Sequence, residues 1–357
     1  MTSRASSVLT AGAALAALLL SASPARAASV VIDDADPAGQ GLNDPTPFVA
    51  IGGNTATTVG AARLAVFQQA AALWGAQLSS AVTIRVHAQF APLTCNASSA
   101  VLASTGATTI HRDFPNAPQL STWYPQALAN ALAGSDLDPT NDDIATTFNS
   151  GIGGSACLAN TTWYLGFDSH PGSNQIDMLT TLLHELAHGL GFQSYENLLS
   201  GGELNGFPDV FLRGARELNV NPTGLADMSD AQRAAANVSD PNLYWSGANV
   251  QSAAATFTAG LIGGHVRLYA PATIQQGSSV SHFSNALTPN ELMEPAYTGP
   301  NHNLTVTMDF LRDLGWPASA STPAVPDLPG GWLWLLAVAL AGAASRRLRR
   351  DPSRCNR

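Results

Sequence analysis

The chain has 357 residues, of which 45% are hydrophobic and 11% are charged. This length is sufficient for one large domain, or two subdomains, with a real core. Its 25 acidic residues outnumber its 16 basic ones, all arginines, and half of those arginines lie in 1–27 and 330–357. The body between them is therefore acidic, which argues against nucleic acid as a partner because phosphate binding needs a basic face.

The first residues have the three parts of a secretory leader. Arg4 precedes an apolar run over 8–20, and Ala25-Arg26-Ala27 is a small-residue cleavage site. We therefore expect residues 1–27 to be a signal peptide. The protein would be exported to the periplasm, the cell surface or the medium.

The body begins with a predictable succession of elements. Residues 28–47 are rich in Asp, Gly, Asn and Pro, which predicts an irregular arm. Apolar spacing predicts a helix over 61–78, and strict alternation predicts a half-buried strand over 82–90. A helix over 123–132, stopped at Gly134, and strands over 144–149 and 161–167 follow. A further helix runs from Ile176 into 184–192, so the order predicts an α/β (α+β) fold with a mixed sheet.

The rest of the body, 193–317, is rich in loops. Only 230–238 looks helical, and 263–269 looks like a glycine-led strand. We therefore divide the body into an N-terminal catalytic subdomain, 28–192, and a C-terminal subdomain, 193–317.

The most informative stretch is His184-Glu185-Leu186-Ala187-His188-Gly189-Leu190-Gly191-Phe192. On a helix, His184 and His188 project from one face about one turn apart. Two neutral imidazoles at this spacing can bind one Zn²⁺, and Glu185 can serve as general base toward a water that the metal activates. The alternative is a pair of core or surface histidines that match the pattern by chance.

A catalytic zinc site needs a third protein ligand. In the short metzincin motif it is a histidine six residues after the second, but Ser194 occupies that position and is a poor ligand. A glutamate such as Glu203 or Glu217 is one substitute. His282, in Ser281-His282 and eleven residues before Met293, is the better candidate, and His265 is a weaker one.

Four ordered features resemble the leishmanolysin-type metzincins. They are the stretch 184–192, Ser281-His282, Glu291-Leu292-Met293, and 306–316, where a helix ends in Asp313-Leu314-Gly315-Trp316. The resemblance implies a metzincin-like catalytic domain with a twisted mixed sheet and an active-site helix. It also implies His184, His188 and His282 as zinc ligands, Glu185 as the base, Gly191 as the turn after the helix, and Met293 as the methionine of the Met-turn. The segment between Phe192 and Ser281 would be an insertion.

These features predict a zinc metalloendopeptidase that hydrolyses peptide bonds in protein or peptide substrates. No serine or cysteine nucleophile signature competes with this interpretation. The alternative is a catalytically inactive, metzincin-like surface protein that serves binding or adhesion, although the intact Glu185 argues against it.

Two further sites follow from composition. Cys95 and Cys157 are an even pair in an exported body, which suggests a disulfide rather than two free thiols, whereas Cys355 lies beyond the apolar tail. Residues 136–143 gather oxygen ligands that could bind a structural Ca²⁺. This segment lacks the glycine and distal glutamate of an EF-hand loop, so a solvated turn is the better prediction.

The C-terminal end has three parts. A linker rich in Pro, Ser and Ala over 318–329 leads to Gly330-Gly331, an apolar run over 332–344 and a basic cluster over 346–350. This tail, 330–357, resembles the GlyGly-CTERM and PEP-CTERM sorting tails of exported bacterial proteins. The resemblance implies temporary membrane anchoring and a C-terminal sorting protease as partner, and the alternative is a permanent membrane anchor.

Overall fold

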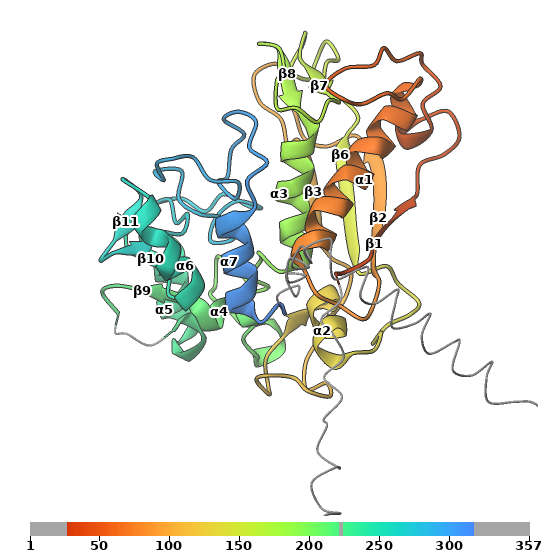
Figure 1. Cartoon of the computed structure of the whole chain (residues 1–357). Coiled ribbons are helices and arrows are strands. Elements are labelled where there is room, and N and C mark those ends of the chain that lie inside the picture. Colours follow the sequence, from red (N-terminus) through yellow and green to blue (C-terminus); the bar gives the residue numbers. More distant parts are fainter. Residues whose placement is uncertain (1–26, 221–223, 318–357) are drawn as a thin grey trace, which may run out of the picture. The chain divides into compact units, whose positions relative to one another are not determined.

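The computed structural model describes residues 27–220 and 224–317 (Figure 1). The chain divides into two compact units, 1–319 and 320–357, and every described residue belongs to the first. Nearly all of the expected leader, the linker 318–329 and the tail 330–357 lie outside the described residues. Among the residues that are described, none of the helices has the length and apolar character needed to cross a membrane.

Three α-helices are interspersed among the strands of the first half of the described chain. Its elements are β1 (Val30–Asp34), α1 (Val59–Gln77), β2 (Ile84–Ala91), β3 (Ala103–Ala107), β4 (Ile110–His111), β5 (Tyr124–Pro125), α2 (Gln126–Ala133), β6 (Ile144–Asn149), β7 (Thr162–Tyr164), β8 (Gln175–Asp177) and α3 (Met178–Leu190).

The second half has shorter elements and more loops, as its glycines and prolines predict, but it contains two short α-helices besides the one expected over 230–238. Its elements are α4 (Val210–Gly214), β9 (Ala215–Glu217), α5 (Asp230–Ala236), β10 (Leu243–Trp245), α6 (Ala248–Ala253), β11 (Leu261–Ile262), β12 (His265–Val266) and α7 (Thr305–Leu314).

A four-stranded sheet in the order β1-β2-β6-β3 forms the framework. β1 and β6 run parallel to β2, whereas β3 runs antiparallel to β6 at one edge. The mixed sheet confirms the coarse α/β prediction. In β2 the side chains of Ile84, Val86 and Ala88 are buried, as the alternation of the sequence predicts.

Four details of the prediction were wrong. Residues 30–34 form β1 instead of an irregular arm, because Val30 to Ile32 pair with Ile84 to Val86 despite the polar composition around them. The predicted strand over 161–167 is confined to β7. The helix expected from residue 123 begins after Pro125, which is its N-cap. Instead of one strand over 263–269, β11 and β12 form a hairpin in which Gly263 and Gly264 both have positive φ.

α1 and α3 lie together on one face of the sheet, α1 against β1 and α3 against β3 and β6 (Figure 1). The buried Trp74 of α1 donates its indole N–H to the Leu183 carbonyl of α3 at 3.2 Å. Gly189 allows α3 to approach β6 closely, since a Cβ at this position would overlap the side chain of Ile144. Contacts with α1 and β6 therefore help to fix the position of α3.

An aromatic cluster joins α3 to the second half of the chain. Phe192, just after α3, stacks on Phe310 of α7 with ring centroids 3.8 Å apart and meets Phe283 edge-on at 4.9 Å. The Trp316 indole after α7 donates to the Leu190 carbonyl at 2.8 Å. The segment that carries His282 is thereby anchored to the C-terminal end of α3.

Cys95 and Cys157 form a disulfide, with an S–S distance of 2.12 Å. It connects the loop between β2 and β3 to the loop between β6 and β7, 62 residues further along the chain. Cys355 lies outside the described residues.

Candidate metal centre

The helix that carries the first two histidines begins two residues later than expected. Asp177 is its N-cap, and its carboxylate accepts a hydrogen bond from the Thr180 N–H at 2.6 Å. α3 therefore starts at Met178 rather than at Ile176. Its apolar side chains are buried, which leaves His184 and His188 one turn apart on the face toward the second half of the chain.

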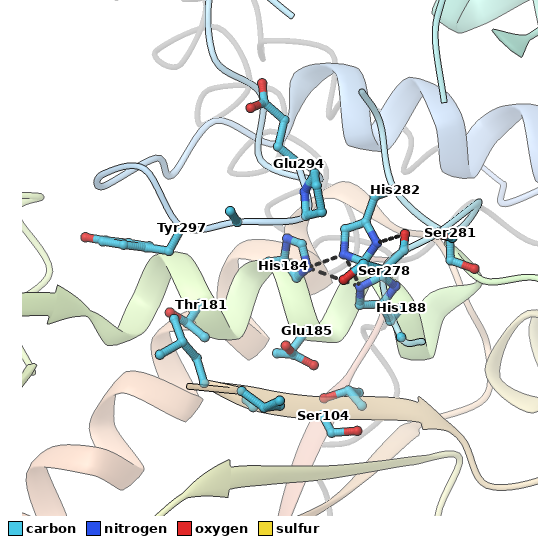
Figure 2. A pocket seen from close by; sticks show the side chains of 18 of the residues that line it. Ser104, Thr181, His184, Glu185, His188, Ser278, Ser281, His282, Glu294 and Tyr297 are labelled. Carbon is cyan, nitrogen blue, oxygen red and sulfur yellow. Dashed lines mark hydrogen bonds between the residues drawn. The ribbon is translucent and has the colours of Figure 1, made fainter. Parts of the chain in front are cut away.

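The structure brings His282 to this pair, although it lies 98 residues after His184. The three Nε2 atoms form a nearly equilateral triangle with sides of 3.1, 3.1 and 3.2 Å. Figure 2 shows the three rings converging from α3 and from the segment that carries Ser278 and Ser281. In the described part of the chain, no other group of three or more His, Cys, Asp or Glu side chains brings its ligand atoms this close together.

The second nitrogen of each ring fixes which nitrogen carries the proton. The Nδ1 atoms of His184, His188 and His282 lie 2.7–2.8 Å from the backbone carbonyl oxygens of Leu292, Phe192 and Ser278, respectively. A carbonyl oxygen only accepts hydrogen bonds, so each Nδ1 must donate. In a neutral ring the lone pair is then on Nε2. Three lone pairs consequently face one another across about 3 Å.

This arrangement fits a metal ion. Tetrahedral zinc with Zn–N bonds of about 2.0–2.1 Å separates its nitrogen ligands by about 3.3 Å, close to the observed sides of the triangle. Burial lowers the pKa of His184, lowers that of His188 to about 3, and holds that of His282 well below its usual range. The rings are therefore neutral at pH 7, the form in which histidine binds metals. A cation would compensate the otherwise repulsive lone pairs.

Glu185 is placed for proton transfer beside the three histidines. Its carboxylate lies between α3 and the strand that carries Ser104 (Figure 2). Burial raises its pKa to about 7, and a hydrogen bond with the Thr105 side chain opposes the shift. A carboxyl with such a pKa exchanges protons readily near neutral pH.

Two turns orient the ligands. Gly191, with φ of +128°, ends α3 and turns the chain so that the next carbonyl, that of Phe192, reaches His188. Met293 is fully buried, and its carbonyl accepts from the Phe283 N–H at 2.8 Å. The turn that contains Met293 thus connects the neighbour of His282 to Leu292, whose carbonyl holds His184.

The alternative ligands lie elsewhere. The Ser194 hydroxyl donates to Asp209 at 2.9 Å, and Glu203 pairs with Arg233 at 3.2 Å. Glu217 accepts from the Asn219 N–H, and the His265 ring stacks on Tyr244 with centroids 4.7 Å apart. None of these four side chains belongs to the histidine cluster.

The acidic segment 136–143 forms a turn whose carboxylates accept hydrogen bonds from the segment itself and from neighbouring residues. Asp138 accepts from the hydroxyl of Thr140 at 2.6 Å and from the side-chain amide of Asn141 at 2.8 Å. Asp143 accepts from the side chain of Asn130 at 2.7 Å. The predicted structural Ca²⁺ thus has no additional support, and these contacts resemble those of a solvated turn.

Sequence reasoning missed the residues that hold the start of α3. His302 Nε2 lies 2.9 Å from the Asp177 carboxylate, and His302 Nδ1 lies 3.0 Å from the Ser169 hydroxyl. The Tyr297 hydroxyl accepts from the Asp177 N–H at 3.0 Å. Each of these three contacts joins residues that are at least 120 positions apart along the chain, so no local pattern could reveal them.

The histidines and Glu185 open into a cavity of about 940 Å³. Its walls are the edge strand β3 and the preceding loop, α3, and segments 193–199, 276–282 and 290–301. The lining side chains include several carboxyls and no arginine. A segment of polypeptide fits a cavity of this size.

A family model described as SPBPB7E8-like matches residues 84–256. This range includes α3 and the first two histidines and ends before His282. No curated protein matches the chain, and no solved structure matches it either.

Proposed function

We propose that the protein is a secreted or surface-attached zinc endopeptidase with a metzincin-like catalytic domain. The observation that carries this proposal is the triangle of three Nε2 acceptors, each set by a backbone carbonyl, beside a buried glutamate in an open cavity. His184, His188 and His282 would hold the ion, and a fourth position would remain open toward the cavity.

In the proposed reaction, zinc when bound supplies Lewis acidity, which activates water and polarises the scissile carbonyl. Glu185 accepts the proton of the attacking water and returns it to the leaving amine. Its raised pKa suits both steps, because the same carboxyl must take up and release a proton near neutral pH. No covalent bond to a side chain is required.

A free strand edge supports a peptide as substrate. Thr108 N–H donates to Asp143 O and Asn149 N–H donates to Leu102 O, so the even-numbered residues of β3 are the ones that bond to β6. The N–H and C=O groups of Ala103, Thr105 and Ala107 therefore point to the open edge. An extended peptide can add to such an edge as a further strand.

The cavity favours cleavage within a chain over removal of C-terminal residues. A carboxypeptidase needs a cation to bind the terminal carboxylate, usually an arginine. The lining residues include no arginine, and the whole sequence has no lysine.

Two substitutions test the proposal with casein or a peptide library as substrate, with and without a chelator. Glu185→Gln should keep one equivalent of zinc and lose at least about a hundredfold in kcat, as loss of a general base does. His282→Ala should lose zinc, whereas the matched change His265→Ala should not. Retained cleavage in Glu185→Gln contradicts the assigned base. Bound zinc without cleavage in the wild type would favour the inactive binding protein instead.

Export and sorting complete the proposal. The disulfide between Cys95 and Cys157 is typical of an oxidising compartment, consistent with removal of residues 1–27 during export. The tail, 330–357, would contact the membrane and be cut by a sorting protease. Mass spectrometry of the exported protein tests both points: a chain that begins at Met1 excludes the leader, and a chain that ends at Arg357 excludes processing of the tail.

A further inference from the structure

Gln193 is a polar residue of the cavity to which the reaction assigns no role. It follows Phe192 directly and lines the cavity beside His188 and Glu185. Its Oε1 is shielded from solvent, and it has no hydrogen-bond partner in the described residues. Leaving a shielded acceptor unpaired costs free energy, so such a group in a cavity is suited to a ligand that donates to it.

The Gln193 amide packs on the face of β3 at Gly106, beside the open edge. A Cβ built on Gly106 would be 3.2 Å from Gln193 Oε1 and 3.9 Å from Nε2. The amide therefore occupies the space that glycine leaves free at this point of the strand. Thr105 and Ala107, on either side of Gly106, are two of the residues whose backbone groups face outward.

The direction of β3 determines which part of a substrate lies here. Antiparallel addition is the slightly more stable way to extend this edge, and it would run the substrate from Ala107 toward Ala103. Because Thr105 lies beside Glu185, the segment near Ala107 would precede the scissile bond. Gln193 is on that side.

We propose that Gln193 binds the main chain of the substrate on the N-terminal side of the scissile bond. A glutamine amide offers one acceptor and two donors, which match the C=O and N–H of a peptide group. Such a contact is independent of the substrate side chain and would set the register of the substrate against β3. This inference rests on the proposed endopeptidase function and adds a binding residue to it.

The test compares two peptides with the same scissile bond, one extended by four residues on its N-terminal side and one truncated there. Gln193→Ala should raise KM for the extended peptide about fivefold, the net contribution of about one hydrogen bond, and should change kcat less than twofold. KM for the truncated peptide should not change. Gln68→Ala, on the exposed face of α1, is the matched control and should alter neither value.

Gly106→Ala perturbs the same amide without altering its chemistry, because the new Cβ would be 3.2 Å from Gln193 Oε1 and would push the amide slightly away. It should raise KM for the extended peptide by less than Gln193→Ala does, and in the Gln193→Ala background it should have no additional effect. Zinc content, measured in every variant, should remain one equivalent.

An unchanged KM for the extended peptide in Gln193→Ala overturns the inference. A change that follows residues on the C-terminal side of the scissile bond overturns it as well. Either result leaves the proposed function intact, since the wild type still cleaves. Absence of chelator-sensitive cleavage in the wild type overturns the proposed function, and the inference fails with it.

Discussion

The contact between Gly189 and Ile144 gives a quantitative test of how α3 is positioned. Gly189 directly follows His188 in α3, and Ile144 is the first residue of β6. A Cβ at residue 189 would be 2.9 Å from both Cγ1 and Cδ1 of Ile144 and closer still to Cγ2. Ile144 is only 1% exposed and is β-branched, so its side chain has little room to move.

The expected free-energy changes follow from two opposing terms. Overpacking a buried site costs about 1–3 kcal/mol, and the upper end applies because three atoms are affected. Replacing glycine by alanine inside a helix raises the free energy of unfolding by about 1 kcal/mol, because alanine has the higher helix propensity. Gly189→Ala should therefore lower the free energy of unfolding by about 2 kcal/mol. In an Ile144→Ala background the overlap is absent, and the same substitution should raise it by about 1 kcal/mol.

The two substitutions form a double-mutant cycle: the wild type, Gly189→Ala, Ile144→Ala and the double variant. The effect of Gly189→Ala should differ by about 3 kcal/mol between the two backgrounds. Urea or guanidinium unfolding measures this difference, with chelator present to remove any metal contribution. Ile144→Ala alone should cost about 2–5 kcal/mol. Ile144→Val removes only Cδ1 and should give an intermediate coupling. If Gly189→Ala had the same effect in both backgrounds, α3 would not be held against β6 as described.

Two further predictions concern the disulfide and a buried acid. Replacing Cys95 and Cys157 by serine should lower the free energy of unfolding by about 4 kcal/mol, from the entropy of closing a 62-residue loop; a loss below about 1 kcal/mol in a denaturant titration would contradict this. Burial raises the pKa of Glu196 to about 8, and the nearby Asp209 adds to this shift. Arg233 opposes the shift; its Nε is 3.9 Å from the carboxylate and donates to the Gly201 carbonyl at 2.6 Å. The folded state then binds more protons than the unfolded state, so this contribution to stability is complete below about pH 4.5 and is lost as pH rises through 8, by up to about 1.4 kcal/mol per pH unit. Glu196→Gln should flatten that decline, and an unchanged pH slope would exclude Glu196 as its source.

Local patterns predicted the long elements well. The 61–78 helix, the 82–90 strand and the 144–149 strand correspond to α1, β2 and β6 with small shifts at their ends. In each of these segments the apolar residues recur at a regular spacing from one end to the other. β3 was missed because Ala103–Ala107 contains glycine and small polar residues, and only its pairing with β6 makes it a strand.

The part of the candidate site whose residues lie close together in the sequence could be predicted from their spacing. His184, Glu185 and His188 share one helix, so a helix alone places them together. His282 required the resemblance to a known family, because its approach to α3 depends on the packing of Phe283 against Phe192. The carbonyl partners of the three rings could not be predicted, since any residue can supply a backbone oxygen.

The chain order of the three histidines has a consequence for when the site can exist. His282 follows His188 by 94 residues, and the carbonyl that orients His184 belongs to Leu292, 108 residues further on. During synthesis, and during the proposed export, a chain that emerges from its N-terminus therefore presents two histidines long before the third. An interrupted or degraded chain has an incomplete site. On the proposed function, peptide cleavage begins only after nearly the whole body has crossed the membrane and folded, so completion of the fold itself protects the cell that exports it.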